Sequence, residues 1–496
     1  MKSVLLVVVG LLAATLLVLL LIGRGFASGR AARLLSIGRL SAGLSASWLG
    51  ASLRRLMATG ERRARIDEAR RRSDAERIAA TMGQMKGALM KLGQLLSFVS
   101  DDVPAEYRQA LASLQAAAPP MGFPLVRDVA ERELGRPLER AFARFDTHPL
   151  AAASIGQVHR ATLPSGEEVV VKIQYPGVAE AIAADLANVD LLQRMIAPLY
   201  PTLDPRPVIE ELRARLSEEL DYRREAASQT AFAELYEGHP YIRIPRIIAS
   251  HSTSRVLTSE YVAGRRFDEI VAADTETRSR YGEILYRFVF GSIIRFGVFN
   301  GDPHPGNYLF DTAGRMVFLD FGCVKYFPEG MLQTWRQLVT AHLSRDRDGF
   351  YRRLLELGFI RPGAPLDPAL LYDYFGYFYE PWHEDREFTF SPDYNGQSMR
   401  RVFAPTGRFV GLEKQFNMPP DFVFVNRIQW GVYSLLSTLR ATRNWHHIHR
   451  ELLHNAPPST ELGELDASYR ARWLAARGLE GQELLLTPMG VRRRAA

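Results

Sequence analysis

The sequence predicts an α+β protein that follows a hydrophobic amino-terminal segment. Short apolar strands separated by turns are expected within residues 149–265, and helical patterns dominate from Thr277 onward. Strands gathered in one part and helices in another are typical of this fold class. The chain has 496 residues, of which 47% are apolar and 24% charged, as in globular proteins with more than one core. The only cysteine is Cys323, which excludes an internal disulfide.

Residues 4–22 form a nearly unbroken apolar run. A helix of this length crosses a hydrocarbon core of about 30 Å. A cleaved signal peptide is the alternative, but the run is longer than an ordinary signal core, and residues 23–26 make a poor cleavage site. Lys2 alone precedes the run, whereas several arginines follow it, which places the rest of the chain in the cytoplasm. We therefore expect a single-pass anchor, residues 1–23, in the inner (cytoplasmic) membrane of the cell.

The net charge of +7 is concentrated in the arginine-rich residues 54–72. This run contains no aromatic residue that could stack on bases, so we expect no nucleic-acid partner. Its position close to the apolar segment indicates a juxtamembrane role instead. Residues 24–75 are interpreted as a basic linker, part of which could also lie on the membrane surface.

A helix is expected over residues 73–98, because apolar residues recur there at intervals of three and four. Lys91 and Gln94 are three residues apart and share one face of this helix. Spacing alone favours an ordinary solvent-facing surface for both. Residues 76–148 are interpreted as a helical extension, with a second helix over residues 101–118.

Residues 149–174 have the layout of a phosphate-binding small lobe. A loop of small residues from Ala151 to Val158 precedes a turn at residues 164–166 and a strand over residues 167–174 that carries Lys172. Small residues let backbone N–H groups approach phosphates, and a lysine neutralises phosphate charge when a carboxylate holds it in place. A plain edge-strand lysine is the alternative.

Two further segments complete this lobe. A helix is expected over residues 208–235, on which Glu218 and Glu225 share a face and one carboxylate pairs with Lys172. Glu260 and Val262 follow another strand at the position of a hinge, where backbone groups would meet an adenine.

Residues 299–322 predict a metal-phosphate site. Strands are expected at residues 308–310 and 316–319, joined by a turn at residues 311–314. A hairpin this short brings its ends together, so the oxygen atoms of Asp302, Asn307 and Asp320 converge. Hard cations such as Mg²⁺ prefer oxygen ligands, completed by phosphate oxygens. The order of these residues is that of a kinase catalytic loop followed by a metal-binding Asp-Phe-Gly.

Taken together, these motifs resemble the UbiB/AarF family of atypical kinases, which are protein-kinase-like proteins linked to ubiquinone biosynthesis. The matching stretches are residues 91–94, 151–158, 171–177, 219–225, 301–307 and 320–322. The resemblance covers roughly residues 78–440. It implies a protein-kinase-like two-lobed fold, with an N-lobe at residues 149–265, a C-lobe at 266–460 and a C-terminal tail at 461–496.

The resemblance also implies a complete site. Asp302, Lys172 and Lys91 are expected to be catalytic, and Asn307 and Asp320 to bind Mg²⁺. The expected nucleotide-binding residues are Ala151, Ala152, Ala153, Ser154, Ile155, Gly156, Gln157, Val158, Lys172, Glu225, Glu260, Val262, Gln94 and Glu219. Lys172 pairs with Glu225, and Lys91 is held by Glu219. The helix that carries Lys91 occupies the place of a peptide substrate in this family.

The function implied is that of a membrane-anchored kinase or ATPase that binds ATP and Mg²⁺ and supports isoprenoid-quinone biosynthesis, without phosphorylating proteins in trans. The expected partners are the nucleotide, membrane lipids or isoprenoid quinone precursors, and quinone-biosynthesis proteins. One alternative is a nucleotide-binding pseudokinase scaffold for a lipid-biosynthesis complex, suggested by the alanine-rich loop. Another is a small-molecule phosphotransferase, which leaves residues 91–94 unexplained. Many bacterial relatives carry hydrophobic helices at the C-terminus, whereas the anchor expected here is N-terminal.

The C-lobe contains two groups of potential metal ligands. Residues 382–385 contain a histidine followed by two acidic residues, and residues 446–449 contain three histidines. We expect a surface loop for the first group and a helix surface for the second. Residues 350–378 are expected to be helical and aromatic, and residues 426–436 to form a buried helix.

Overall fold

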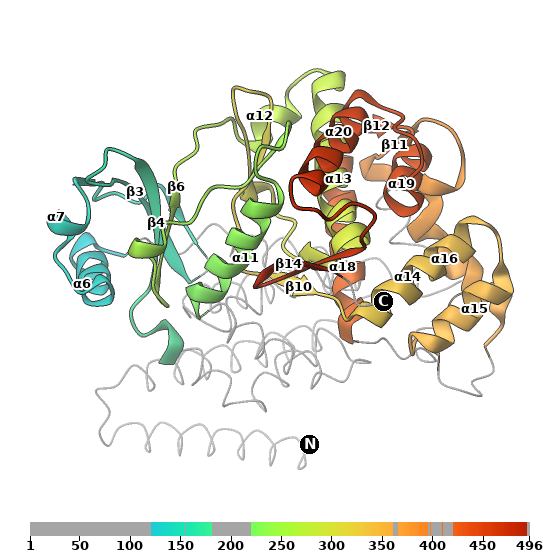
Figure 1. The fold of residues 1–496 in the computed structure, drawn as a ribbon, viewed down its shortest axis with the longest axis horizontal. Helices are drawn as coiled ribbons and strands as arrows, with labels where there is room; N and C mark the ends of the chain where they lie inside the picture. The colour runs from blue at the N-terminus through green and yellow to red at the C-terminus, as the bar shows by residue number, and fades with distance from the viewer. Residues whose placement is uncertain are drawn as a thin grey trace, which may run out of the picture. The chain divides into compact units, whose positions relative to one another are not determined.

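The computed structural model describes residues 121–153, 155–180, 220–360, 366–394, 397, 409 and 420–493 (Figure 1). The expected membrane anchor, the basic linker and the helices at residues 73–98 and 101–118 lie outside these ranges. So do the site candidates Lys91, Gln94, Ser154 and Glu219. Within the ranges described, every helix is too short or too polar to cross a membrane.

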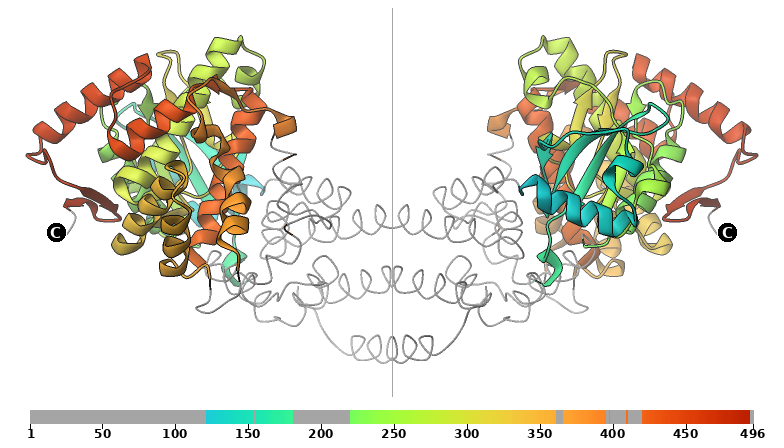
Figure 2. Two further views of the ribbon diagram at one scale, coloured as in Figure 1. Left: turned by 90° about the vertical axis from the view of Figure 1, so that its right-hand side faces the viewer. Right: turned by 90° about the vertical axis from the view of Figure 1, so that its left-hand side faces the viewer.

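The small lobe is built on a five-stranded antiparallel sheet in which β1, β3, β4 and β6 follow one another and β2 pairs with β3. Its strands are β1 (Arg144–Phe145), β2 (Ala151–Ala152), β3 (Gly156–Thr162), β4 (Glu168–Gln174) and β6 (Val256–Glu260). The predicted strand, turn and strand are confirmed, with Gly166 in the turn at a φ of 87° that favours glycine. Helix α6 (Phe123–Leu134) packs against β4 and β6, as Figure 2 shows, and the short α7 (Leu138–Ala141) follows it.

Helix α11 (Tyr222–Leu235) lies beside β6 and carries Glu225 in its first turn (Figure 1). The prediction of one helix running through residues 220–222 is wrong, because Asp221 has extended backbone angles and its side chain accepts a hydrogen bond from the N–H of Arg223. Aspartate is a favoured N-cap residue and here starts the helix. The argument that placed Glu218 and Glu225 on one helix face therefore fails.

The predicted hairpin is confirmed. Strands β8 (Tyr308–Phe310) and β9 (Met316–Phe318) are antiparallel, and Gly314 in the turn has a φ of 76°. Strand β5 (Ile242–Arg243) pairs with β9 on its other side. Just before the hairpin, β7 (Val298–Asn300) pairs with β10 (Val324–Tyr326), so the chain segments on both sides of the hairpin are joined. This pairing brings residues 300–307 close to residues 320–323.

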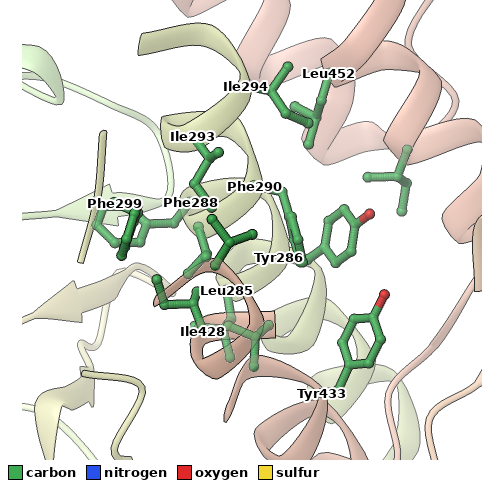
Figure 3. Packing of buried hydrophobic residues seen from close by; sticks show 14 of the residues in the cluster. Leu285, Tyr286, Phe288, Phe290, Ile293, Ile294, Phe299, Ile428, Tyr433 and Leu452 are labelled. Atoms are coloured by element: carbon green, nitrogen blue, oxygen red, sulfur yellow. The ribbon is translucent and has the colours of Figure 1, made fainter. Parts of the chain in front are cut away.

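The large lobe is helical and is centred on the buried helix α13. Its helices are α12 (Phe267–Val271), α13 (Thr275–Phe296), α14 (Glu329–Leu343), α15 (Arg347–Glu356), α16 (Pro368–His383), α18 (Pro420–Leu439), α19 (Trp445–His454) and α20 (Glu461–Ala475). Figure 3 shows Phe288 beside Phe299 on one side of α13 and Phe290 beside Tyr286 on the other. Burial on several sides explains why residues 284–294 of α13 are mostly apolar. The expected helices at residues 350–378 and 426–436 correspond to α15, α16 and α18.

Two predictions for the large lobe are correct only in part. Residues 382–385 were expected in a surface loop, and Glu384 and Asp385 are exposed after the helix, but Trp382 and His383 end α16 and the Trp382 side chain is buried. Residues 446–449 were expected on a helix surface, and they lie on α19, but His449 is fully buried and its ring stacks on Trp382 at 3.8 Å. Packing against this aromatic core is the physical reason that His449 is buried. No group of three or more histidine, cysteine or acidic residues arranged to hold a metal ion occurs within the described part.

The C-terminal segment also packs onto the large lobe. Residues 461–493, expected as a tail, form α20 and a hairpin of β13 (Leu484–Thr487) and β14 (Gly490–Arg493). Tyr469, Trp473 and the leucines of β13 belong to the hydrophobic core. Strand β14 packs against α11, the helix that carries Glu225.

Candidate functional site

Lys172 lies at the centre of a charged cluster. It sits on β4 opposite Val158 on one side and Leu257 on the other. The Lys172 Nζ atom donates hydrogen bonds to both carboxylate oxygens of Glu225, at 2.8 and 2.9 Å, and lies 3.6 Å from Asp320 Oδ2. The pairing of Lys172 with Glu225 that the resemblance implied is thus present.

The electrostatics keep Lys172 charged. Burial alone would lower the pKa of Lys172, but the nearby carboxylates of Asp320 and Glu225 outweigh it and hold the pKa well above its usual value. The Tyr222 ring, 5.1 Å from Lys172 Nζ, adds a cation–π contact. Glu225 is 6% exposed, so this ion pair lies in a largely water-free setting. A charged lysine fixed at a known place can neutralise phosphate oxygens.

The loop before β8 forms the second half of the cluster. The Asn307 side-chain amide donates to the backbone oxygen of Asp302 at 3.0 Å and to its carboxylate at 3.3 Å. The N–H of Leu319 donates to the Asn307 carbonyl, which places Asn307 beside Asp320. Asp302, Asn307 and Asp320 thus converge as the hairpin argument predicted. Burial, and then the charges of Asp302 and Asp320, raises the pKa of the Tyr308 hydroxyl between them.

The sequence analysis missed two features that support this loop. The Asn300 side chain donates to the Asp320 carbonyl and accepts from the Asp302 N–H at 3.3 Å, so one amide links both aspartates. Gly431 in α18 packs against Pro303 so closely that a Cβ atom there would overlap the proline ring. Asn300 lies opposite Val324 in the pairing of β7 with β10, so a prediction of that pairing would have placed Asn300 beside Asp320. Nothing in the linear sequence connects Gly431 with Pro303.

The alanine-rich loop divides into an exposed part and a buried part. Ala151 and Ala152 are exposed in β2, which pairs with Val158 and Gln157 of β3. Gly156 is buried, and a Cβ atom there would overlap the carbonyl oxygen of Ile173, so this glycine allows β3 to approach β4.

Two other residues of the loop are engaged within the lobe. The Gln157 side chain bonds to the backbone of Met121 at 2.7 and 3.2 Å and is turned to the interior. Ile155 is 3% exposed. Among the described residues of the loop, Ala151 and Ala152 are exposed, and Ala153 and Val158 are half-buried.

The backbone N–H groups at the end of β6 differ in whether they are paired. The N–H groups of Glu260 and Tyr261 donate to the carbonyls of Arg246 and Glu168, and the Glu260 carboxylate pairs with Arg243. The N–H of Val262 has no hydrogen-bond partner among the described residues. The Val262 backbone therefore suits the hinge role better than the Glu260 side chain does.

The donor set suits Mg²⁺ and a nucleotide. Magnesium usually takes one or two protein oxygens and completes its shell with water and phosphate. Asp320 provides a carboxylate, and the Asn307 Nδ2 bonds to Asp302 leave Oδ1, the atom that can coordinate a cation. Lys172 lies 3.6 Å from the Asp320 carboxylate. The predicted acceptor side, made of Lys91, Gln94 and Glu219, lies outside the described residues.

A small antiparallel sheet with a lysine–glutamate pair to an adjoining helix, followed by a helical lobe with a catalytic loop and Asp-Phe-Gly, defines a protein-kinase-like protein. Comparison with known proteins narrows the class. Residues 113–354 match the ABC1 atypical kinase-like domain. The chain belongs to the UbiB/AarF family of atypical kinases, whose ABC1 domain it carries.

Individual relatives agree with this assignment. The chain is 35% identical over 290 residues to the mitochondrial atypical kinase COQ8 of Saccharomyces cerevisiae, and the match covers 58% of each chain. Identity to the mitochondrial atypical kinase COQ8B of Rattus norvegicus is 33% over 290 residues, covering 58% of this chain and 55% of that one. The matches thus span little more than half the length of these relatives. The solved structure of Rv3197 from Mycobacterium tuberculosis, in complex with erythromycin, is 33% identical with a TM-score of 0.57, over 75% of this chain and 93% of the other.

Proposed function

We propose that this protein is a Mg-ATP-dependent atypical kinase or ATPase. The observation that carries the proposal is the cluster in which Lys172 binds Glu225 and lies 3.6 Å from Asp320, beside Asn307 and Asp302. This is the constellation that phosphoryl transfer requires, since that reaction depends mainly on positioning and on neutralising phosphate charge.

Each side chain has a distinct role in this proposal. Lys172 neutralises phosphate oxygens, and Glu225 holds it in place. Asn307 and Asp320 hold the cation, which when bound neutralises charge on the phosphates. Asp302 orients the attacking hydroxyl or water. The exposed Ala151–Ala152 strand covers the phosphates, and the Val262 N–H meets the adenine.

The acceptor side of the proposal rests on the family resemblance. Lys91 and Gln94 face the nucleotide, Glu219 holds Lys91, and their helix fills the place of a peptide substrate. ATP hydrolysis, or transfer to a small or lipid-like acceptor, is therefore favoured over phosphorylation of other proteins. We further propose that the N-terminal segment anchors the protein at the cytoplasmic membrane face, where it supports isoprenoid-quinone biosynthesis with partner enzymes.

Purified full-length protein tests the activity directly. We expect Mg-dependent ATP binding and turnover, and loss of turnover in Asp320→Asn. Absence of nucleotide binding, or unchanged turnover in this variant, would reject the proposal that the protein is an enzyme. A parallel genetic test uses a deletion strain. We expect altered quinone content that the wild-type gene restores and that Lys172→Ala and Asp302→Ala do not. Restoration by both variants would favour the scaffold function instead.

A further inference from the structure

The C-terminal helix α20 binds the end of α11 that lies farthest from Glu225. The last carbonyl groups of any helix have no partner within the helix and must bond elsewhere. The Tyr469 hydroxyl of α20 lies 2.8 and 3.0 Å from the carbonyl oxygens of Leu235 and Glu237, which share its single proton. The Trp473 indole N–H lies 3.4 Å from the Glu234 carbonyl. Helix α20 thus caps α11 with side chains.

A buried ion pair fixes α20 itself. Asp466, one turn before Tyr469, accepts a hydrogen bond from Arg295 of α13 at 2.6 Å and lies 3.4 Å from His239 Nε2. The backbone N–H groups of Tyr241 and Ile242 donate to His239 Nδ1, so Nε2 carries the proton and donates to Asp466. Burial would raise the pKa of Asp466, but the charge of Arg295 holds that pKa well below its usual value. The Tyr469 ring packs edge-on against His239 at 4.5 Å.

Helix α11 transmits this restraint to the proposed nucleotide site. From Glu225 to Leu235 it spans about 15 Å of continuous helix. Near its middle, Ser228 accepts a hydrogen bond from Tyr326 at 3.2 Å. One turn before its end, the centroid of the Phe232 ring lies 5.0 Å from that of Phe321 in the Asp-Phe-Gly. A helix held at its middle and at one end cannot tilt, so the other end stays in place.

We propose that α20 is a positioning element for the proposed nucleotide site and that Tyr469 is its principal positioning residue. By holding the C-terminal end of α11, Tyr469 keeps Glu225 within hydrogen-bond distance of Lys172. The expected effect of Tyr469 on Mg-ATP binding rests on the proposed function. The restraint on α11 can be measured without any nucleotide.

The test compares two tyrosine-to-phenylalanine variants in the full-length protein. Tyr469→Phe removes the capping hydroxyl and keeps the ring. Tyr433→Phe is the matched control, because its buried hydroxyl also donates to a backbone carbonyl, that of Phe378 at 2.9 Å, within the large lobe and away from α11. The first measurement is amide hydrogen exchange of residues 222–232 without nucleotide. The second is Mg-ATP affinity.

We expect Tyr469→Phe to raise exchange in α11 and to weaken Mg-ATP binding, each by about five-fold, which corresponds to the loss of one buried hydrogen bond. Tyr433→Phe should change both by less than about two-fold. Equal effects of the two variants would overturn the proposal, because they would indicate general destabilisation.

A double-mutant cycle with Glu225→Gln separates positioning from stability. Residues this far apart ordinarily have additive effects. If Tyr469 acts through Glu225, Tyr469→Phe should weaken binding by less than about two-fold further in the Glu225→Gln background. A full five-fold further loss would overturn the proposal. If the wild type binds no Mg-ATP, the proposed function fails, and the exchange comparison alone decides whether Tyr469 restrains α11.

Discussion

At the scale of single residues, opposite charges held close together govern the site. Lys172 is 2.8 Å from Glu225 and 3.6 Å from Asp320, so both carboxylates compete for one ammonium group. Glu225 holds Lys172 through two hydrogen bonds, and Asp320 is the carboxylate proposed to hold a cation. If Glu225 were uncharged, Lys172 would be drawn towards Asp320 and would occupy the place proposed for Mg²⁺.

Glu225→Gln should therefore lower ATP turnover by at least about ten-fold, because the lysine is no longer held where it meets phosphate. Steady-state ATPase measurements across Mg²⁺ concentrations check this, and higher Mg²⁺ should recover part of the loss. The control is Glu168→Gln on the same strand, whose exposed carboxylate pairs only with Arg160 among the described residues. Turnover in Glu225→Gln equal to that of the control would contradict the assignment.

His342 illustrates how a buried neutral residue produces pH dependence. Its Nε2 donates to the Tyr372 carbonyl at 3.0 Å, so its Nδ1 accepts from His383 at 3.0 Å. Burial lowers the pKa of His342 to about 3. In the unfolded chain its pKa is about 6.5, so between pH 6.5 and 3 the unfolded state binds the additional proton. Stability is therefore complete above pH 6.5 and falls as the pH decreases.

From this shift we expect His342 to contribute a loss of about 2 kcal/mol in unfolding free energy between pH 6.5 and 5. Urea denaturation at both pH values measures it. His342→Gln, which keeps a donor for the Tyr372 carbonyl, should show a smaller loss over this interval. An identical pH dependence in variant and wild type would contradict the prediction.

At the scale of elements, α18 supports the proposed catalytic loop, residues 300–307, through close packing. Gly431 faces Pro303, which follows Asp302 directly, and the two leave no room for a Cβ atom. A buried helix thus fixes the backbone position of the loop. Glycine has a low helix propensity and lowers the stability of a helix, so the close approach to Pro303 explains why a glycine occupies this position.

Gly431→Ala should displace the loop and lower turnover by about ten-fold or more, because misplacing a reacting group by about 1 Å costs as much as a hundred-fold. Overpacking should also reduce stability by about 1–3 kcal/mol. Gly376→Ala in α16 is the control, because the nearest atom to its Cβ would be His342 Cε1 at 3.9 Å, an ordinary contact. Both variants are compared by ATPase activity and by thermal unfolding. Full activity in Gly431→Ala would disprove the supporting role.

At the scale of the whole molecule, buried ion pairs connect segments that are distant in sequence. Arg287 of α13 donates to Glu283 at 2.7 Å and lies 2.8 Å from Glu451 of α19. Arg443 joins the same group through Glu283 at 3.0 Å. Arg287 is 3% exposed, so each charge depends on its partners for compensation. This cluster ties the central helix to the C-terminal part of the chain.

Arg287→Ala should lower the unfolding free energy by about 3–5 kcal/mol, because it removes the arginine that pairs with the buried Glu451 and leaves Glu283 with Arg443 alone. Denaturant unfolding with two independent probes measures the change. The exposed pair of Arg160 with Glu168 is the comparison, and Arg160→Ala should cost less than about 1 kcal/mol. Similar costs for the two arginines would show that burial does not govern their contribution.

The sequence by itself determined the local features of this protein. The β8–β9 hairpin, the strand that carries Lys172 and the convergence of Asp302, Asn307 and Asp320 follow from turn residues, alternation and short connections. The pairing of Lys172 with Glu225 came from the family resemblance, since the helix predicted over residues 208–235 offered several carboxylates. The order of motifs likewise indicated the family that the comparisons then showed.

Only the tertiary structure decided which residues far apart in the chain touch. It buried His449 against Trp382, placed Gly431 against Pro303, and turned the supposed tail into a helix whose Tyr469 caps α11. The physical reason is that burial and close approach depend on what packs against a residue. Periodicity and spacing in the sequence describe one segment at a time. They do not show which other segments will pack against a helix and bury the face that the sequence predicts to be exposed to solvent.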